Sequence, residues 1–245
     1  MKATDLDSPE TTICRIGVIE SKNFLRHVYE NFYKIFKDNS KSLPKGLMVE
    51  IGSGAGFLKK IIPEVITTDI MKLPNCDMCF SAEKIPLKDK SVSAYYLLNT
   101  FHHIKNPKKA LSEFSRTLKV GGKVIMIEPY NSFWGRFIYK NFHHETFDPE
   151  GGWLVGNKGD LSSANGAIPW IIFNRDKKEF ERIFPELKIL KFDPHTPVSY
   201  LISGGFTLPS LLPDSLYPSV KYIESKLTFI KKYTGMFATV VLQKK

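Results

Sequence analysis

The chain has 245 residues, which is long enough for one sizeable hydrophobic core with insertions. Its hydrophobic content of 42% and charged content of 24% exclude a disordered or fibrous protein. The net charge of +10 is compatible with an anionic partner such as nucleic acid or a membrane surface. The lysines, however, are scattered in short groups, which is typical of solvated surface residues, so charge alone disfavours a dedicated nucleic-acid surface.

The amino-terminal sequence "MKATDLDSPETTICRIG" lacks the apolar core of a signal peptide. No stretch approaches the roughly 20 apolar residues that a membrane span requires. The cysteines, Cys14, Cys76 and Cys79, form an odd and sparse set that suits a reducing compartment. We therefore expect a cytoplasmic protein, and we expect the Cys-x-x-Cys pair at 76–79 to be buried thiols rather than a zinc or redox site.

The first predicted elements surround a glycine-rich stretch. Residues 21–39 have apolar side chains at helical spacing and predict an amphipathic helix. A buried strand is expected at 46–52, a helix at 55–62 that ends at Pro63, and a second strand at 64–70.

Strands and helices continue to alternate through the middle of the chain. We expect strands at 77–82 and 92–99, a helix at 107–118 closed by Gly121 and Gly122, and a strand at 123–129. This alternation predicts an α/β fold, a mostly parallel sheet with helices on both faces. A ligand crevice then lies at the carboxyl ends of the strands.

The second half is less regular. A helix at 176–184 and strands at 186–193 and 236–243 bring the predicted sheet to seven strands. The segments 130–174 and 194–227 show little periodicity. We therefore expect a single domain with a helical extension at 1–45, a ligand-binding core at 46–130, and cap segments at 131–175 and 195–234, inserted after the fifth strand and between the last two strands.

The stretch "VEIGSGAGFL" places Gly52, Gly54 and Gly56 after a strand, where the backbone can approach a ligand closely. A dinucleotide fingerprint requires its last glycine one place later, where Phe57 stands, and no Gly-Lys-Ser/Thr of a phosphate loop follows. Asp69 ends the next strand and is placed to accept hydrogen bonds from ribose hydroxyls. The ligand is therefore predicted to carry a ribose.

With these features the sequence resembles the class I S-adenosylmethionine-dependent methyltransferases, especially the branch that includes quinone and sterol C-methyltransferases. The matching motifs are "VEIGSGAG", Asp69, "SAEKIPLKDKSVSAYYLLNTFHHI" and "LKVGGKVIMIEP", in the family's order over about residues 46–130. The resemblance implies a Rossmann-like fold, S-adenosylmethionine as cofactor and S-adenosylhomocysteine as product.

The resemblance also implies which residues hold the cofactor. The glycine loop and Asn99 would lie against the methionine part, Glu50 would hold the loop and the ammonium end, and Asp69 would bind the ribose. Ile70 would flank the adenine, and Ala82 and Glu83 would meet its edge. The expected cofactor-binding residues are Glu50, Gly52, Ser53, Gly54, Gly56, Asp69, Ile70, Ala82, Glu83 and Asn99.

Candidate catalytic residues follow the fourth and fifth strands. His102 and His103 stand where the family's acceptor meets the methyl group, and either could take a proton from a hydroxyl. Tyr130 follows the fifth strand and is a similar candidate. Local packing and loop hydrogen bonds are the alternative roles for all three.

The second half offers candidates for binding the acceptor. "FHHETFDP" groups His143 and His144 with Glu145 and Asp148, but these residues come from one short loop with no second cluster, so we expect no metal site. We expect His143, His144, Trp153 and His195 to line the acceptor pocket.

These features favour a methyltransferase that acts on a small or medium-sized acceptor, at oxygen first and at carbon as the second choice. A nucleic-acid methyltransferase is the first alternative, although "NTFH" lacks the Asn/Asp-Pro-Pro-aromatic motif of amino-methylating enzymes. A non-catalytic protein that docks on a membrane or a partner is the second. Prolines interrupt 196–227 and argue against one long membrane helix there, while an apolar or lipid-like acceptor and peripheral membrane contact stay open.

Overall fold

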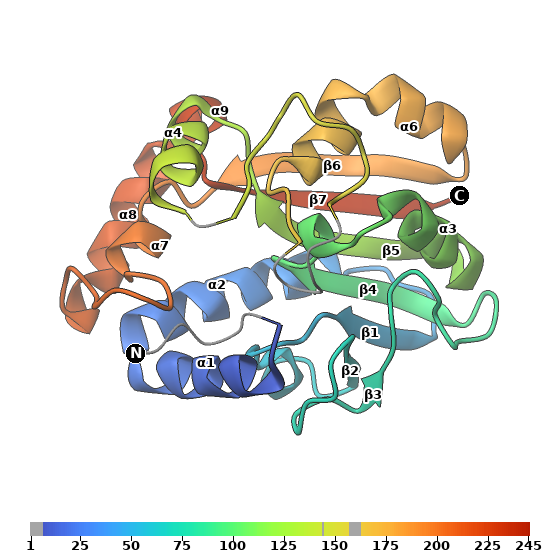
Figure 1. The fold of residues 1–245 in the computed structure, drawn as a ribbon, viewed down its shortest axis with the longest axis horizontal. Coiled ribbons are helices and arrows are strands. Elements are labelled where there is room, and N and C mark those ends of the chain that lie inside the picture. Colours follow the sequence, from blue (N-terminus) through green and yellow to red (C-terminus); the bar gives the residue numbers. More distant parts are fainter. Residues whose placement is uncertain (1–6, 144, 157–162) are drawn as a thin grey trace.

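A seven-stranded sheet forms the centre of the computed structural model, which describes residues 7–143, 145–156 and 163–245 (Figure 1). The strand order is β3-β2-β1-β4-β5-β7-β6, and β7 runs antiparallel to both of its neighbours. The other paired strands are parallel, which confirms the predicted mostly parallel α/β sheet. The strands are β1 Leu47–Ile51, β2 Val65–Asp69, β3 Met78–Cys79, β4 Val92–Leu98, β5 Leu118–Pro129, β6 Leu187–His195 and β7 Phe237–Lys244.

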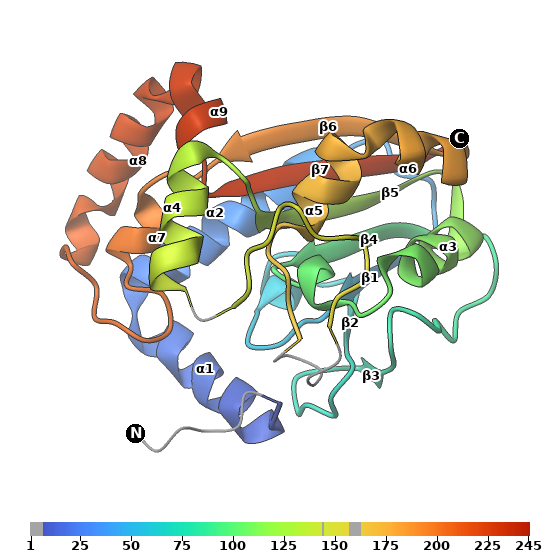
Figure 2. The ribbon, with the colours of Figure 1, turned by 45° about the horizontal axis from the view of Figure 1, so that its top comes forward.

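Helices flank this sheet and gather at one of its ends, where α4, α7, α8 and α9 lie together (Figures 1 and 2). None of the helices in the described ranges is long and apolar enough to cross a membrane. The α-helices are α1 Pro9–Ser21, α2 Asn23–Asn39, α3 Pro107–Thr117, α4 Phe133–Phe142, α5 Ile168–Trp170, α6 Lys177–Ile183, α7 Ser199–Ile202, α8 Tyr217–Lys226 and α9 Lys231–Thr234.

Two neighbouring tyrosines of β4 show that both faces of the sheet are covered. Tyr95 packs against Phe114 of α3, with ring centroids 4.7 Å apart, and Tyr96 packs against Phe36 of α2 at 5.4 Å. Because successive side chains of a strand point to opposite faces, α2 and α3 lie on opposite sides of the sheet. These four aromatic rings are completely buried.

The amino-terminal extension contains two helices rather than the one that periodicity predicts. The expected helix at 21–39 is present as α2. The preceding α1 begins with Ser8, whose hydroxyl accepts a hydrogen bond from the Thr11 amide, and with Pro9 in its first turn. Two of its buried residues, Thr11 and Thr12, are polar, which is why its sequence lacks a clear apolar stripe.

Three predicted elements of the core differ in the structure. The helix expected at 55–62 is a single 3₁₀ turn, Leu58–Lys60, because Pro63 follows too soon for a longer helix. The third strand covers Met78–Cys79, and the thiol of Cys79 is exposed, so the prediction of two buried thiols is wrong. The fifth strand begins at Leu118, and Gly121, with a φ of +80°, lies inside it where the register with β4 shifts.

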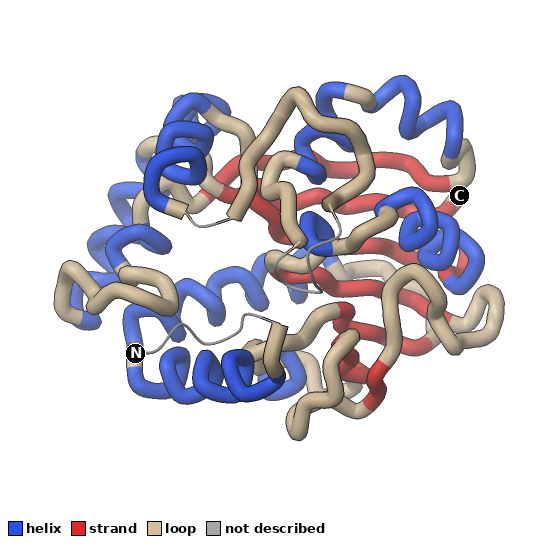
Figure 3. Tube along the Cα trace, viewed as in Figure 1, coloured by secondary structure: helices blue, strands red, loops and turns tan. Residues whose placement is uncertain are grey.

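The segments predicted to be irregular contain helices. Between 130 and 174 the chain forms α4 and then α5, which continues into a π-helical turn at Ile171–Arg175. Between 194 and 227 it forms α7 and α8. Helix α4 has apolar residues on its exposed side as well, namely Phe133, Phe137 and Phe142. Its sequence therefore lacks the clear alternation of apolar and polar positions by which an amphipathic helix is predicted. The described chain between α4 and α5 is loop (Figure 3).

Candidate functional site

A cavity of about 430 Å³ opens at the carboxyl ends of β1, β2 and β4. This is the place where a ligand is expected in a parallel sheet. Helices α1, α2 and α4 and the segment 145–147 complete its wall. Every residue expected to hold the cofactor lines this one cavity, namely Glu50, Gly52, Ser53, Gly54, Gly56, Asp69, Ile70, Ala82, Glu83 and Asn99.

The glycine loop leaves no room for side chains behind it. Gly52 has a φ of +67°, and a Cβ there would lie 2.3 Å from the Thr100 side chain. A Cβ on Gly56 would lie 2.6 Å from the Tyr33 hydroxyl. Gly54 has a φ of +48° but its Cβ would meet no atom closer than 3.9 Å. The loop is thus packed against the protein on one side and open at Gly54, which lets a ligand approach the backbone.

Asp69 ties the glycine loop to the end of β2. One of its carboxylate oxygens accepts a hydrogen bond from the Gly54 amide and the other accepts one from the Met71 amide, both at 3.0 Å. These bonds hold the carboxylate in one orientation at the cavity wall. An ionised carboxylate has further lone pairs, so Asp69 can still accept hydrogen bonds from a ligand.

Two buried acceptor oxygens lie in the same cavity. Oε2 of Glu50 and Oδ1 of Asn99 have no hydrogen-bond partner among the described residues, although each of these two atoms is shielded from water. Asn99 adopts a left-handed backbone conformation, with a φ of +52°. Buried polar atoms are normally paired, so two such acceptors indicate a ligand that donates hydrogen bonds.

Burial raises the pKa of Glu50 to about 8; a hydrogen bond from Ser53 lowers it and the charge of Asp69 raises it. The folded chain therefore binds a proton at Glu50 more tightly than the unfolded chain does. Stability from this group is complete below the ordinary pKa of 4.5 and is lost as the pH rises through 8. We expect the ligand-free protein to lose a few kcal/mol of unfolding free energy between pH 5 and 8.5, and Glu50→Gln to lose less, as measured by urea unfolding. Parallel curves for the two proteins would contradict this expectation.

The residues expected near an adenine lie at the rim of the cavity. Ile70 is 43% exposed and Ala82 is buried. Glu83 accepts a hydrogen bond from the Asn106 amide, 2.9 Å from its Oε1, and so anchors the loop that precedes α3. Glu83 therefore has a structural contact in addition to its place in the cavity wall.

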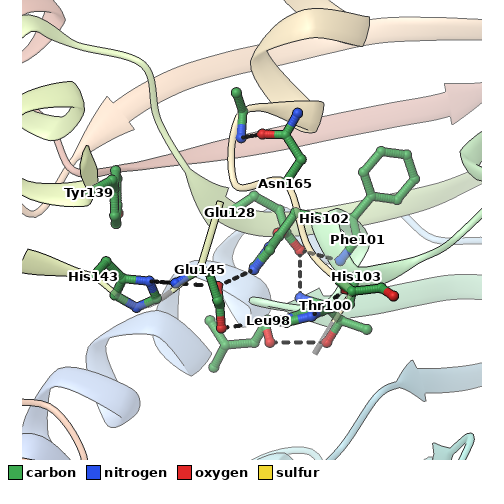
Figure 4. A network of polar contacts seen from close by, with 12 residues as sticks. Leu98, Thr100, Phe101, His102, His103, Glu128, Tyr139, His143, Glu145 and Asn165 are labelled. Atoms are coloured by element: carbon green, nitrogen blue, oxygen red, sulfur yellow. Dashed lines mark hydrogen bonds and ion pairs between the residues drawn. The ribbon is translucent and has the colours of Figure 1, made fainter. Parts of the chain in front are cut away.

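His102 lies between two carboxylates, as Figure 4 shows. Its Nδ1 is 2.6 Å from Oε2 of Glu128, and its Nε2 is 3.2 Å from Oε2 of Glu145. Burial lowers the pKa of His102, but Glu128 and Glu145 outweigh it and raise the pKa to about 10. Without a ligand the ring is therefore an imidazolium that donates to both carboxylates, and it cannot take up another proton.

Glu128 is itself completely buried at the end of β5. Its Oε1 accepts hydrogen bonds from the Thr100 amide at 2.9 Å and the Phe101 amide at 2.8 Å. The carboxylate thus fixes both the backbone that carries His102 and the ring of His102.

Glu145 also lies close to two further histidines, His103 and His143. Its Oε1 lies 3.7 Å from Nε2 of His103, and its Oε2 lies 3.8 Å from Nδ1 of His143. Burial raises the pKa of Glu145, but His102 and the other two histidines outweigh it and hold that pKa below its ordinary value. His102, His103 and His143 all line the cavity. His144 lies outside the described residues.

Three of the predicted site residues, Tyr130, Trp153 and His195, do not line the cavity. Tyr130 is buried with its ring 5.8 Å from that of Phe192.

Trp153 is buried, and its indole donates to Asp176 at 2.9 Å. His195 lies within hydrogen-bond distance of Thr196 and Thr239, and removal from water lowers its pKa to about 3. In the structure these three residues have packing or structural contacts.

Sequence reasoning missed several residues of the site, among them Glu128, which supports His102 without lining the cavity itself. Glu128 stood in the recognised motif "LKVGGKVIMIEP", and its place at a strand end was a usable signal. Thr12 and Arg15 belong to α1, which was not predicted. Tyr139 and Tyr200 come from segments that were expected to be irregular.

Residues 49–126 match a family model described as a methyltransferase domain. The match covers the last three residues of β1, the glycine loop, β2, β3, β4 and most of β5. The matched range includes the glycine loop and Asp69. It ends before Glu128 of β5 and before Glu145.

A curated relative and two solved structures extend this comparison. An uncharacterized protein of Methanocaldococcus jannaschii is 32% identical over 128 residues, which is 46% of this chain and 60% of the relative's length. A geranyl diphosphate C-methyltransferase from Streptomyces coelicolor A3(2), in complex with Mg²⁺, geranyl diphosphate and S-adenosyl-L-homocysteine, has a TM-score of 0.55 at 12% identity, over 90% of this chain and 80% of that one.

A methyltransferase from Thermotoga maritima, described as a possible histamine N-methyltransferase, has a TM-score of 0.52 at 18% identity, over 89% of both chains. At these identities the two structural likenesses establish the fold alone.

Proposed function

We propose that the chain, whose residues 49–126 match a methyltransferase domain, is a class I S-adenosylmethionine-dependent methyltransferase that transfers a methyl group from S-adenosylmethionine to a small or medium-sized acceptor. We propose oxygen as the atom methylated, with carbon as the second choice. The observation that carries the proposal is the pair of unpartnered buried acceptors beside the glycine loop, Glu50 Oε2 and Asn99 Oδ1.

The residues present fit the cofactor. Its amino-acid end carries an ammonium group, and Glu50 and Asn99 supply acceptor oxygens in a space shielded from water. Asp69 would accept hydrogen bonds from the ribose hydroxyls, and the open backbone at Gly54 would allow close contact. Ile70 and Ala82 would flank the adenine.

The acceptor would occupy the part of the cavity that faces the second half of the chain. Tyr139, Phe147, Tyr200 and Phe206 line the cavity and provide flat apolar surfaces. His102, His103 and Glu145 add a polar, charged group in the same space. An acceptor with an apolar body and one hydroxyl would match both features.

The cofactor supplies an electrophilic methyl group when it is bound. The protein must then hold the acceptor oxygen in line with that methyl group and exclude water. We propose that the aromatic wall excludes water, and that the cluster of His102, His103 and Glu145 holds the acceptor oxygen in line with the methyl group. His102 orients the Glu145 carboxylate there rather than acting as a base, because Glu128 and Glu145 keep it protonated. The Glu145 carboxylate would accept the proton that the acceptor hydroxyl loses as the oxygen–methyl bond forms and the sulfur–methyl bond breaks.

Isothermal titration tests the cofactor part of the proposal. We expect S-adenosylhomocysteine to bind at least about 10-fold more tightly than 5′-methylthioadenosine, which lacks the ammonium group and leaves Glu50 and Asn99 unpaired. Equal affinities would contradict the placement of the amino-acid end. Binding of neither compound, and no label transferred from methyl-labelled S-adenosylmethionine to a panel of hydroxylated acceptors, would overturn the proposed function.

A further inference from the structure

We infer that His102, His103 and Glu145 form a binding site for one divalent transition-metal ion, such as Zn²⁺. The inference deepens the proposed function, on which it rests, because it places the ion at the acceptor end of the cavity. It departs from the sequence-based expectation of no metal, which considered the loop at 143–148 without a partner cluster. The fold brings Glu145 of that loop to the two histidines that follow β4.

The spacing of the donor atoms suits a metal ion. One possible ligand atom from each of His102, His103 and Glu145, a ring nitrogen or a carboxylate oxygen, lies within 4.8 Å of the other two. Nε2 of His102 is 3.2 Å and Nε2 of His103 is 3.7 Å from the Glu145 carboxylate. A tetrahedral ion with bonds of about 2.0–2.1 Å separates its ligands by about 3.4 Å. Small side-chain movements would therefore close the site.

Both histidines are oriented through their other ring nitrogen. Nδ1 of His102 faces the buried carboxylate of Glu128 at 2.6 Å, and Nδ1 of His103 lies 3.3 Å from the carbonyl oxygen of Ser163. These acceptors keep the proton on Nδ1 and so direct the Nε2 lone pair of each ring toward Glu145. A carboxylate or carbonyl behind each histidine is the usual outer shell of a metal centre.

The ligand set also indicates the kind of ion and its use. Two imidazoles with one carboxylate favour zinc or a similar transition metal over Mg²⁺ or Ca²⁺. Three protein ligands leave a position open on the side that faces the cavity, as in catalytic rather than structural sites. An acceptor hydroxyl can fill that position, where the ion would hold it for methylation. Metal binding would displace the proton that His102 shares with Glu145.

Metal binding by the 245-residue protein tests the inference without any measurement of activity. Chelator-treated protein is titrated with ZnCl₂ by calorimetry and with CoCl₂ in the visible spectrum. We expect one Zn²⁺ per chain and a Co²⁺ absorption band of a low-coordinate nitrogen and oxygen site. Glu145→Gln and His103→Gln should each raise the Kd for Zn²⁺ by about 100-fold and remove the Co²⁺ band.

A surface His–Glu pair provides the matched control. Nδ1 of His27 and Oε2 of Glu30 on α2 are 2.9 Å apart, and both side chains are substantially exposed. The double variant His27→Gln, Glu30→Gln should bind Zn²⁺ like the wild type. Cooperative urea unfolding of each variant shows that it is folded. Should one variant of the cluster fail to fold, the other still decides the result.

The outcomes separate this inference from the proposed function. The absence of saturable Zn²⁺ binding, or binding that both cluster variants retain, overturns the metal site whether or not S-adenosylhomocysteine binds. Zn²⁺ binding that only the His27 and Glu30 substitutions weaken also overturns it. A protein that binds Zn²⁺ at this cluster but neither S-adenosylhomocysteine nor S-adenosylmethionine keeps the metal site and loses the proposed function.

Discussion

Asp69→Asn is expected to weaken the binding of S-adenosylhomocysteine by about 100-fold. The ionised carboxylate fixes the Gly54 and Met71 amides and would accept hydrogen bonds from the ribose. Hydrogen bonds to charged groups contribute about 1.5–3 kcal/mol each, and every 1.4 kcal/mol is tenfold in affinity. An asparagine amide would also direct N–H groups at one of these donors. Isothermal titration at pH 7.5 measures the change.

Asp77→Asn is the matched control for Asp69. Its carboxylate also binds backbone, accepting from the Thr67 amide at 2.9 Å, and it pairs with Lys59 at 2.6 Å. Asp77 does not line the cavity. The variant should unfold at a lower urea concentration and bind S-adenosylhomocysteine within about twofold of the wild type. An Asp69→Asn protein that also keeps wild-type affinity would remove Asp69 from the proposed ribose site.

Glu128→Ala is expected to lower the free energy of unfolding by about 3–5 kcal/mol. The substitution removes the buried partner of the His102 imidazolium and the acceptor of the Thr100 and Phe101 amides. The Phe101 amide and Nδ1 of His102 would then be buried without this partner, which costs more than the loss of an exposed hydrogen bond. Urea unfolding at pH 7 gives the measurement.

Glu128→Gln distinguishes the charge from the hydrogen bonds. Its amide oxygen can still accept from the Thr100 and Phe101 amides, so we expect it to lose less stability than Glu128→Ala. The pKa of His102 should fall, since Glu128 is the first of the carboxylates that raise it. Titration of the His102 ring by NMR follows this change. Equal stability of Glu128→Ala and the wild type would show that the network contributes little to folding.

The cavity wall around the glycine loop could be predicted because its signals are local. Gly52, Gly54 and Gly56 follow one another on a single turn, and Asp69 ends the next strand, so a short sequence carries the whole arrangement. Parallel strands then bring these positions to the same edge of the sheet. The structure accordingly places every one of them in the same cavity wall.

The rest of the site could not be predicted in the same way. Glu145 contacts His102 across 43 residues of chain, and no local pattern encodes that contact. Tyr130 and His195 were chosen because they follow strands, yet packing against Phe192 and hydrogen bonds with Thr239 keep them out of the cavity wall. A place directly after a strand is therefore a weaker indication that a residue lines the cavity than a place in the glycine loop.

The sequence by itself determined the seven strands of the sheet, the helices α2, α3 and α6, and the glycine loop, since hydrophobic period, strand ends and glycine positions are properties of short segments. Tertiary structure alone decided that Glu128 and Glu145 enclose His102. The physical reason is that a buried charge depends on partners that folding brings from distant parts of the chain. The residues around the glycine loop can therefore be recognised in the sequence, while the cluster of His102, His103 and Glu145 is assembled only by the fold.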